Sequence, residues 1–152
     1  MDRVDMNLFT IGFTGKSAEK FFALLESSKA TKLIDIRINR TSQLAGFAKK
    51  KDLEYFLRTI CGADYRHEPM LAPTADMLKD YRSKKTSWLE YERLFTLLLA
   101  ERRVESVLSR QILDGNPVFL CSEHKPDHCH RRLALEYLEE RWEVKSTLIH
   151  IV

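Results

Sequence analysis

Short runs of apolar and β-branched residues alternate along this chain with longer segments whose apolar residues recur at helical spacing. The runs lie at 8–13, 32–38, 117–121 and 146–152, with a weaker one at 64–68. Parallel neighbours in a sheet need a crossover segment between them, usually a helix, so this alternation favours a mainly parallel sheet. We therefore expect residues 1–152 to form a single α/β domain.

The helical segments have recognisable starts and stops. Ser17 is a typical N-cap for the first helix, and Gly62 ends the second where helices favour glycine. Trp88, Tyr91 and Phe95 share one helical face and are expected in the core. The helices after the first are expected at about 51–61, 73–81, 87–113 (as one helix or two) and 127–142.

Composition places the chain among ordinary globular domains. Hydrophobic residues make up 44% and charged residues 31%, which excludes a disordered tail. The N-terminus lacks the apolar core of a secretory signal, and no stretch is long and apolar enough to span a membrane. Three cysteines are too few and odd in number for a disulfide framework, so we expect a reducing cytoplasm and no membrane partner.

The densest group of reactive side chains lies in residues 118–133, VFLCSEHKPDHCHRRL. A strand ends at Cys121, a polar loop containing Glu123 follows, and a helix is expected from Asp127. Cys129, His130 and Arg131 would then occupy its first turn.

Unpaired backbone N–H groups and the dipole at the start of a helix favour an anion, and here Arg131 and His130 add positive charge. A phosphate, a carboxylate or a nucleic-acid backbone group is the simplest ligand. The alternative is that these residues only cap the helix and pair with Asp35 and Glu123.

Ligands of parallel sheets gather outside the carboxyl ends of the strands. Those ends hold residues 12–14, which include the anion-site candidate Thr14, together with 35–37 and 121–123, so we expect them to meet at one mouth. Asp35 and Arg37 lie on the same side of their strand, either as a buried pair or facing a ligand. Tyr65, His67 and Glu68 are expected at the same mouth.

These positions suggest roles. Cys121 is the candidate nucleophile, with burial as a small apolar residue as the alternative. Asp35 or Glu123 is the candidate general base, Arg37 the candidate anion clamp, and His130 a further catalytic candidate. A phosphatase-like arginine six positions after the cysteine is missing, which weakens covalent phosphoryl chemistry.

Residues 37–51 contain five basic residues and no acidic one. Lys49 and Lys50, with Phe47 for base stacking, suit a nucleotide or a phosphate-bearing polymer. A solvated charged surface is the alternative for these lysines.

Zinc is a further alternative, because the 121–130 segment holds two cysteines and three histidines. Adjacent Cys129 and His130 on a helix point about 100° apart, so only one of them could readily join Cys121 at a tetrahedral ion. No cofactor or metal is therefore predicted, and zinc stays a minority reading.

Three motifs carry a resemblance to a known family: TIGFTGKS after the first strand, LIDIR on the second, and CSEHKPDHCHRRLALEYL. Over residues 8–150 the chain resembles the domain-of-unknown-function family 488. The resemblance implies a compact, three-layer, Rossmann-like α/β domain of cytoplasmic bacterial or archaeal proteins. It implies functional positions at Asp35, Arg37, Cys121, Glu123, Cys129, His130 and Arg131.

Two segments depart from the family pattern. Many members have a proline-rich stretch where this chain has INRTSQLAG, and a Gly-Gly pair where it has Leu71-Ala72. These departures leave room for a different substrate.

The sequence as a whole favours an enzyme-like domain that acts on or binds a phosphorylated ligand, either a small molecule such as a nucleotide or a nucleic acid. The alternatives are a non-catalytic nucleic-acid or nucleotide binding module and a Cys/His metal-binding protein. The oligomeric state stays open.

Overall fold

A computed structural model describes residues 5–12, 15–38, 50–121 and 130–151. Five parallel strands form one sheet in the order β3-β2-β4-β1-β5. The strands are β1 (Asp5–Gly12), β2 (Lys32–Asp35), β3 (Asp64–His67), β4 (Pro117–Cys121) and β5 (Lys145–Ile151). The prediction of an α/β fold with a mainly parallel sheet is confirmed.

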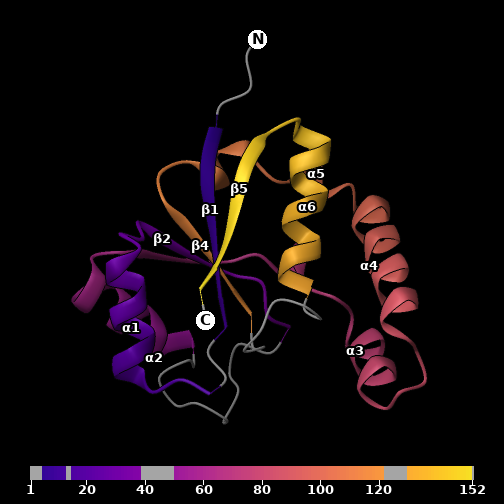
Figure 1. Cartoon of the computed structure of the whole chain (residues 1–152), viewed down its shortest axis with the longest axis horizontal. Helices are drawn as coiled ribbons and strands as arrows, with labels where there is room; N and C mark the ends of the chain where they lie inside the picture. Colours follow the sequence, from indigo (N-terminus) through magenta and orange to yellow (C-terminus); the bar gives the residue numbers. More distant parts are fainter. Residues whose placement is uncertain (1–4, 13–14, 39–49, 122–129, 152) are drawn as a thin grey trace.

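Helices cover both faces of this sheet, with α1 and α2 on one side and α3, α4 and α6 on the other (Figure 1). The α-helices are α1 (Ala18–Ser27), α2 (Lys50–Phe56), α3 (Ala75–Arg82), α4 (Trp88–Arg102), α5 (Val104–Val107) and α6 (His130–Trp142). Short turns of other helix types are η2 (Leu57–Cys61), η3 (Pro69–Leu71) and η4 (Arg110–Leu113). None of the helices described combines the length and apolar composition that crossing a bilayer requires.

Side-chain caps explain where three of the helices begin. Ser17, Thr74 and Ser87 each accept a hydrogen bond from the backbone N–H three residues later. The segment expected to be one helix or two at 87–113 is interrupted at Arg103, which has a left-handed φ of 52°. The start expected at Asp127 lies outside the described residues.

The helix expected at 51–61 changes type halfway. It is an α-helix to Phe56 and a π-helix from Leu57 to Cys61, closed by Gly62 at a φ of 63°. The N–H groups of Gly62 and Ala63 both reach back to the Leu57 carbonyl, which widens the last turn. Apolar periodicity alone does not distinguish such a turn from an α-helix.

Two apolar cores lie on opposite faces of the sheet, because neighbouring residues of a strand point to opposite sides. Leu33 and Val118 pack on the α1 side, whereas Ile34 and Phe119 pack on the α4 and α6 side. Every residue of β4 is buried, as expected for a central parallel strand.

The aromatic residues expected in the core are there. Tyr91 and Phe95 are buried, and partly buried Trp88 stacks on Tyr91 with ring centroids 5.2 Å apart. This confirms that the aromatic face of α4 is a packing surface.

The second strand is shorter than the run at 32–38 suggests. It ends at Asp35, whose carboxylate Oδ1 accepts a hydrogen bond from the Arg37 N–H at 3.1 Å. This bond to the backbone two residues on is an Asx-type turn, which offers the chain an alternative to strand pairing. Residue 38 is consequently exposed.

Candidate functional site

The carboxyl ends of four neighbouring strands lie along one edge of the sheet. Gly12 of β1 pairs with Cys121 of β4, Asp35 of β2 pairs with Leu120, and Asp35 also pairs with His67 of β3. Gly12, Asp35 and Cys121, the described residues of the three predicted strand ends, therefore lie at one edge of the sheet, as expected.

Asp35 and Arg37 form a buried, bidentate ion pair at this edge. Arg37 Nε donates to Asp35 Oδ1 at 2.8 Å and Nη2 donates to Oδ2 at 2.7 Å. Their side chains are 0% and 1% exposed respectively. Two parallel N–H···O bonds are the strongest geometry for such a pair, so Arg37 is held in a fixed orientation.

Residues of β3 complete the surroundings of this pair. Tyr65 donates its hydroxyl to Asp35 Oδ2 at 2.6 Å, and His67 Nε2 lies 3.0 Å from the Arg37 carbonyl oxygen. Asp35 thus accepts four hydrogen bonds, two on each oxygen. With its lone pairs occupied, Asp35 is better arranged to position Arg37 than to take a proton from a substrate.

His130, the first described residue of α6, ties that helix to β2. Its Nε2 lies 2.8 Å from the Ile36 carbonyl oxygen, so this nitrogen carries the hydrogen and donates it. Burial lowers the pKa of His130 to about 4, opposed by this hydrogen bond and reinforced by Arg131. The imidazole is therefore neutral at pH 7 and does not supply the positive charge that the sequence suggested.

Arg131 and Cys121 are in direct contact across the edge. The Arg131 Nη1 donates to Cys121 Sγ at 3.4 Å, and both residues are fully buried. A guanidinium beside the sulfur stabilises negative charge on it, which is the environment of reactive cysteines. The alternative prediction for Cys121, burial as a small apolar residue, also agrees with the structure. Cys121 is the last residue of β4 and packs in the same core as residues of α6.

Lys16 is a site residue that the sequence reasoning missed. It follows β1 and directly precedes the N-cap of α1, and it is only 7% exposed. Its Nζ is buried and has no hydrogen-bond partner among the described residues. Burial, then the positive charges of Arg131 and Lys20, lower the pKa of Lys16, whereas Cys121 raises it.

The position of Lys16 carried a readable signal. A lysine four residues beyond the last residue of the first strand lies in the turn between that strand and its helix, where parallel sheets bind ligands. Its location between a glycine and a capping serine instead made it look like part of an ordinary exposed turn.

Several predicted site residues cannot be placed. Thr14, Lys49, Glu123 and Cys129 lie outside the described residues, as does the rest of the basic segment at 39–49. Lys50 is the first residue of α2, and its side chain is not described. In the part of the chain that is described, no group of three or more His, Cys, Asp or Glu residues is arranged to hold a metal ion.

Similarity to known proteins identifies the family of this chain. No curated protein and no solved structure matches the chain. A family model, described as "Domain of unknown function DUF488", matches residues 17–138. This range includes the Asp35–Arg37 pair, Cys121 and Arg131, and it confirms the resemblance seen in the motifs. Because the match covers well over half of the sequence, the chain belongs to the DUF488 family.

Proposed function

We propose that this domain binds a phosphorylated ligand, a nucleotide or a nucleic acid, at the carboxyl edge of its sheet and acts on it there. The observation that carries the proposal is the buried ammonium of Lys16, which lies in the turn after β1 and has no hydrogen-bond partner among the described residues. The site is proposed to work in a reducing cytoplasm, where Cys121 stays reduced.

A buried cation without a hydrogen-bond partner is costly to the folded protein. Such a cation is typical of a site where a bound ligand supplies the missing hydrogen bonds and the counter-charge. Titratable groups with shifted pKa values at a sheet edge are likewise typical of binding and active sites. An anion that accepts hydrogen bonds from Lys16 Nζ would remove that cost.

Phosphate suits this site better than a single carboxylate does. Its three or more oxygens can accept bonds from several cations at once, and arginine and lysine are its usual partners in proteins. The described edge holds Lys16, Arg37 and Arg131 together with two buried carboxylates, and both carboxylates are already engaged, Asp35 by Arg37 and Glu68 by Arg66. The basic sequence at 37–51 supports a nucleotide or nucleic acid over a sugar phosphate.

Cys121 is the group proposed to carry chemistry. Its sulfur accepts a hydrogen bond from Arg131, so a thiolate there would be stabilised, and it lies at the end of the central strand. In this proposal Arg37 and Lys16 hold the anion, whereas Asp35 and His130 position the backbone and side chains around it.

The experiment is a binding titration with a panel of nucleotides and short oligonucleotides. Lys16→Met is expected to weaken the best ligand at least about tenfold, because a charge-assisted contact is lost. Lys20→Met is the matched control, since Lys20 is an exposed lysine in the first turn of α1, four residues after Lys16. Equal binding by both variants would refute the anion site.

A non-catalytic binding module is the second candidate, and the complete burial of Cys121 favours it. The two are separated by Cys121→Ser. If this variant binds the ligand with unchanged affinity but forms no product, the enzyme reading holds. If the wild-type protein forms no product from any bound ligand while binding stays salt-dependent, the domain is a binding module.

A further inference from the structure

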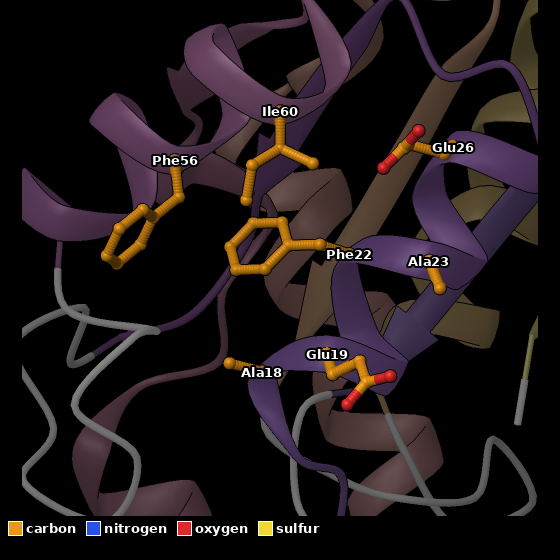
Figure 2. A pocket seen from close by; sticks show the side chains of 7 residues that line it. All are labelled: Ala18, Glu19, Phe22, Ala23, Glu26, Phe56 and Ile60. Carbon is orange, nitrogen blue, oxygen red and sulfur yellow. The ribbon is translucent and has the colours of Figure 1, made fainter.

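An apolar groove lies on the α1 face of the molecule. Figure 2 shows it between α1 and the α2–η2 segment, with the Phe22 ring beside Phe56 and below Ile60. Its volume is about 330 Å³. This is near the lower end of ligand-pocket volumes, and it is enough to receive a large apolar side chain.

The groove continues into an exposed apolar surface. Ile60 is 43% exposed, and neighbouring Tyr55 is 63% exposed with its ring 5.7 Å from that of Phe56. Phe22 and Phe56 make an edge-to-face contact at 5.7 Å, which gives the groove a rigid aromatic floor. Exposed aromatic and aliphatic side chains around a preformed hollow are typical of protein-binding surfaces.

Two glutamates of α1 line the same groove. Glu19 and Glu26 are seven residues apart, which is two helical turns or about 10 Å along the axis. Both carboxylates lie on the α1 side of the groove in Figure 2. The two charged side chains in the lining of this groove are therefore both acidic, and they form its acidic rim, although the whole chain carries a formal charge of +3.

The negative charge of Glu19 and Glu26 determines which kind of molecule can bind in the groove. A nucleic acid or an anionic membrane surface would be repelled by the two carboxylates. A second copy of the chain that used the same face symmetrically would bring Glu19 and Glu26 against their own counterparts. A basic partner meets neither objection.

The backbone geometry favours a helical partner. Ala18 and Ala23, the small residues that line the groove on α1, let another backbone approach closely. The π-helical turn that carries Ile60 is of a rare type that occurs frequently at functional sites.

We propose that this groove docks an amphipathic helix of a partner protein. An apolar side chain of that helix fills the cavity between Phe22, Phe56 and Ile60. Lysine or arginine side chains seven residues apart on the helix pair with Glu19 and Glu26, and this charge pattern selects the partner.

The test uses a fluorescently labelled helical peptide of leucine and lysine, with leucines at i, i+3, i+4 and i+7 and lysines seven residues apart. Its partner is the same peptide with glutamate in place of each lysine. Fluorescence anisotropy with the full chain is expected to show at least about tenfold tighter binding of the lysine peptide. Ile60→Asp should weaken that binding by about tenfold or more. Leu89→Asp, at an exposed position of α4, should leave it unchanged.

The charge-reversal variant Glu19→Lys/Glu26→Lys separates a binding effect from a folding defect, because a misfolded protein would not gain a new binding preference. It is expected to lose the lysine peptide and gain the glutamate peptide. The proposal is overturned if this variant binds both peptides as the wild type does, or if Leu89→Asp is as damaging as Ile60→Asp. It is also overturned if sedimentation shows that the wild type self-associates and that Ile60→Asp abolishes the association, since a second copy would then be the occupant.

Discussion

Arg37 grips the Asp35 carboxylate with two parallel hydrogen bonds, Nε to Oδ1 and Nη2 to Oδ2, although only one residue separates them in the chain. The same carboxylate accepts the Arg37 backbone N–H and the Tyr65 hydroxyl. One side chain therefore ends β2, orients a buried guanidinium and joins β2 to β3. The pair is both a structural unit of the sheet edge and the support on which an anion site can be built.

Replacement of Asp35 by asparagine should be strongly destabilising. The variant keeps the shape of the side chain but leaves the Arg37 charge buried without its counter-ion, which typically costs about 3–5 kcal/mol. Urea unfolding measures this free energy. Tyr65→Phe is the matched control, because it removes a single hydrogen bond to the same oxygen at about 1 kcal/mol. Similar losses in the two variants would mean that the ion pair contributes no special stability.

His130 makes the protein less stable in mild acid. Its pKa is about 4 in the folded protein and near 6.5 when unfolded, so between these values the unfolded state binds more protons. The contribution of neutral His130 to the free energy of unfolding is therefore fully present above pH 6.5. It is lost as the pH falls towards 4, by up to about 3 kcal/mol. His130→Gln, which keeps an N–H donor, should flatten that part of the curve.

The measurement for His130 is the free energy of unfolding at several pH values between 4 and 7 in both proteins. Carboxylates also titrate in this range, but they do so in wild type and variant alike, so the difference between the two curves isolates the imidazole. Parallel curves would contradict the buried, neutral state of His130.

Gly115 is a second position where one substitution tests the geometry. Its φ is +74°, and a Cβ placed there would lie 2.7 Å from Thr31 Oγ1, the hydroxyl that accepts the Asn116 N–H. Gly115→Ala should cost more than the roughly 1–2 kcal/mol expected for a left-handed alanine. Gly62→Ala is the control, since Gly62 has a similar φ of +63° but no described atom within 4 Å of the added Cβ. Thermal unfolding that ranks the two alanine variants equally would contradict the contact.

The sequence predicted the fold well because its signals were local. Ser17 and Gly62 mark helix ends through their own backbone chemistry, and the alternation of apolar runs and helices leaves few topologies for the sheet. The meeting of Asp35 and Cys121 at one edge followed from that topology alone.

What the sequence could not supply are contacts made between elements. The place of Lys16 in the turn after β1 could be read from the sequence, but its burial could not, because burial depends on how other elements pack around that turn. The charge of His130 could not be predicted either, because desolvation by distant residues removes it. The widened turn at 57–61 is closed by the N–H groups of Gly62 and Ala63 on the Leu57 carbonyl, and apolar spacing does not encode that bonding pattern.

Lys16 should reveal a trade-off between stability and binding. In the protein without ligand its ammonium is buried without a hydrogen-bond partner among the described residues, and burial, then the charge of Arg131, lower its pKa. Lys16→Met keeps most of the apolar stem and removes the charge, so the free energy of unfolding should rise, by about 0.5–2 kcal/mol, the usual gain from a relieved functional strain. Urea unfolding without ligand measures the gain.

The exposed-site variant Lys20→Met should change that free energy by less than about 0.5 kcal/mol, as surface substitutions usually do. Adding the best phosphorylated ligand should then reverse the ranking, because a ligand that binds only the folded wild type stabilises it by mass action. A Lys16→Met protein that is less stable than wild type in the absence of ligand would show that the ammonium is already satisfied within the fold. In that case the lysine would be a structural residue, and the anion site would lose its main support.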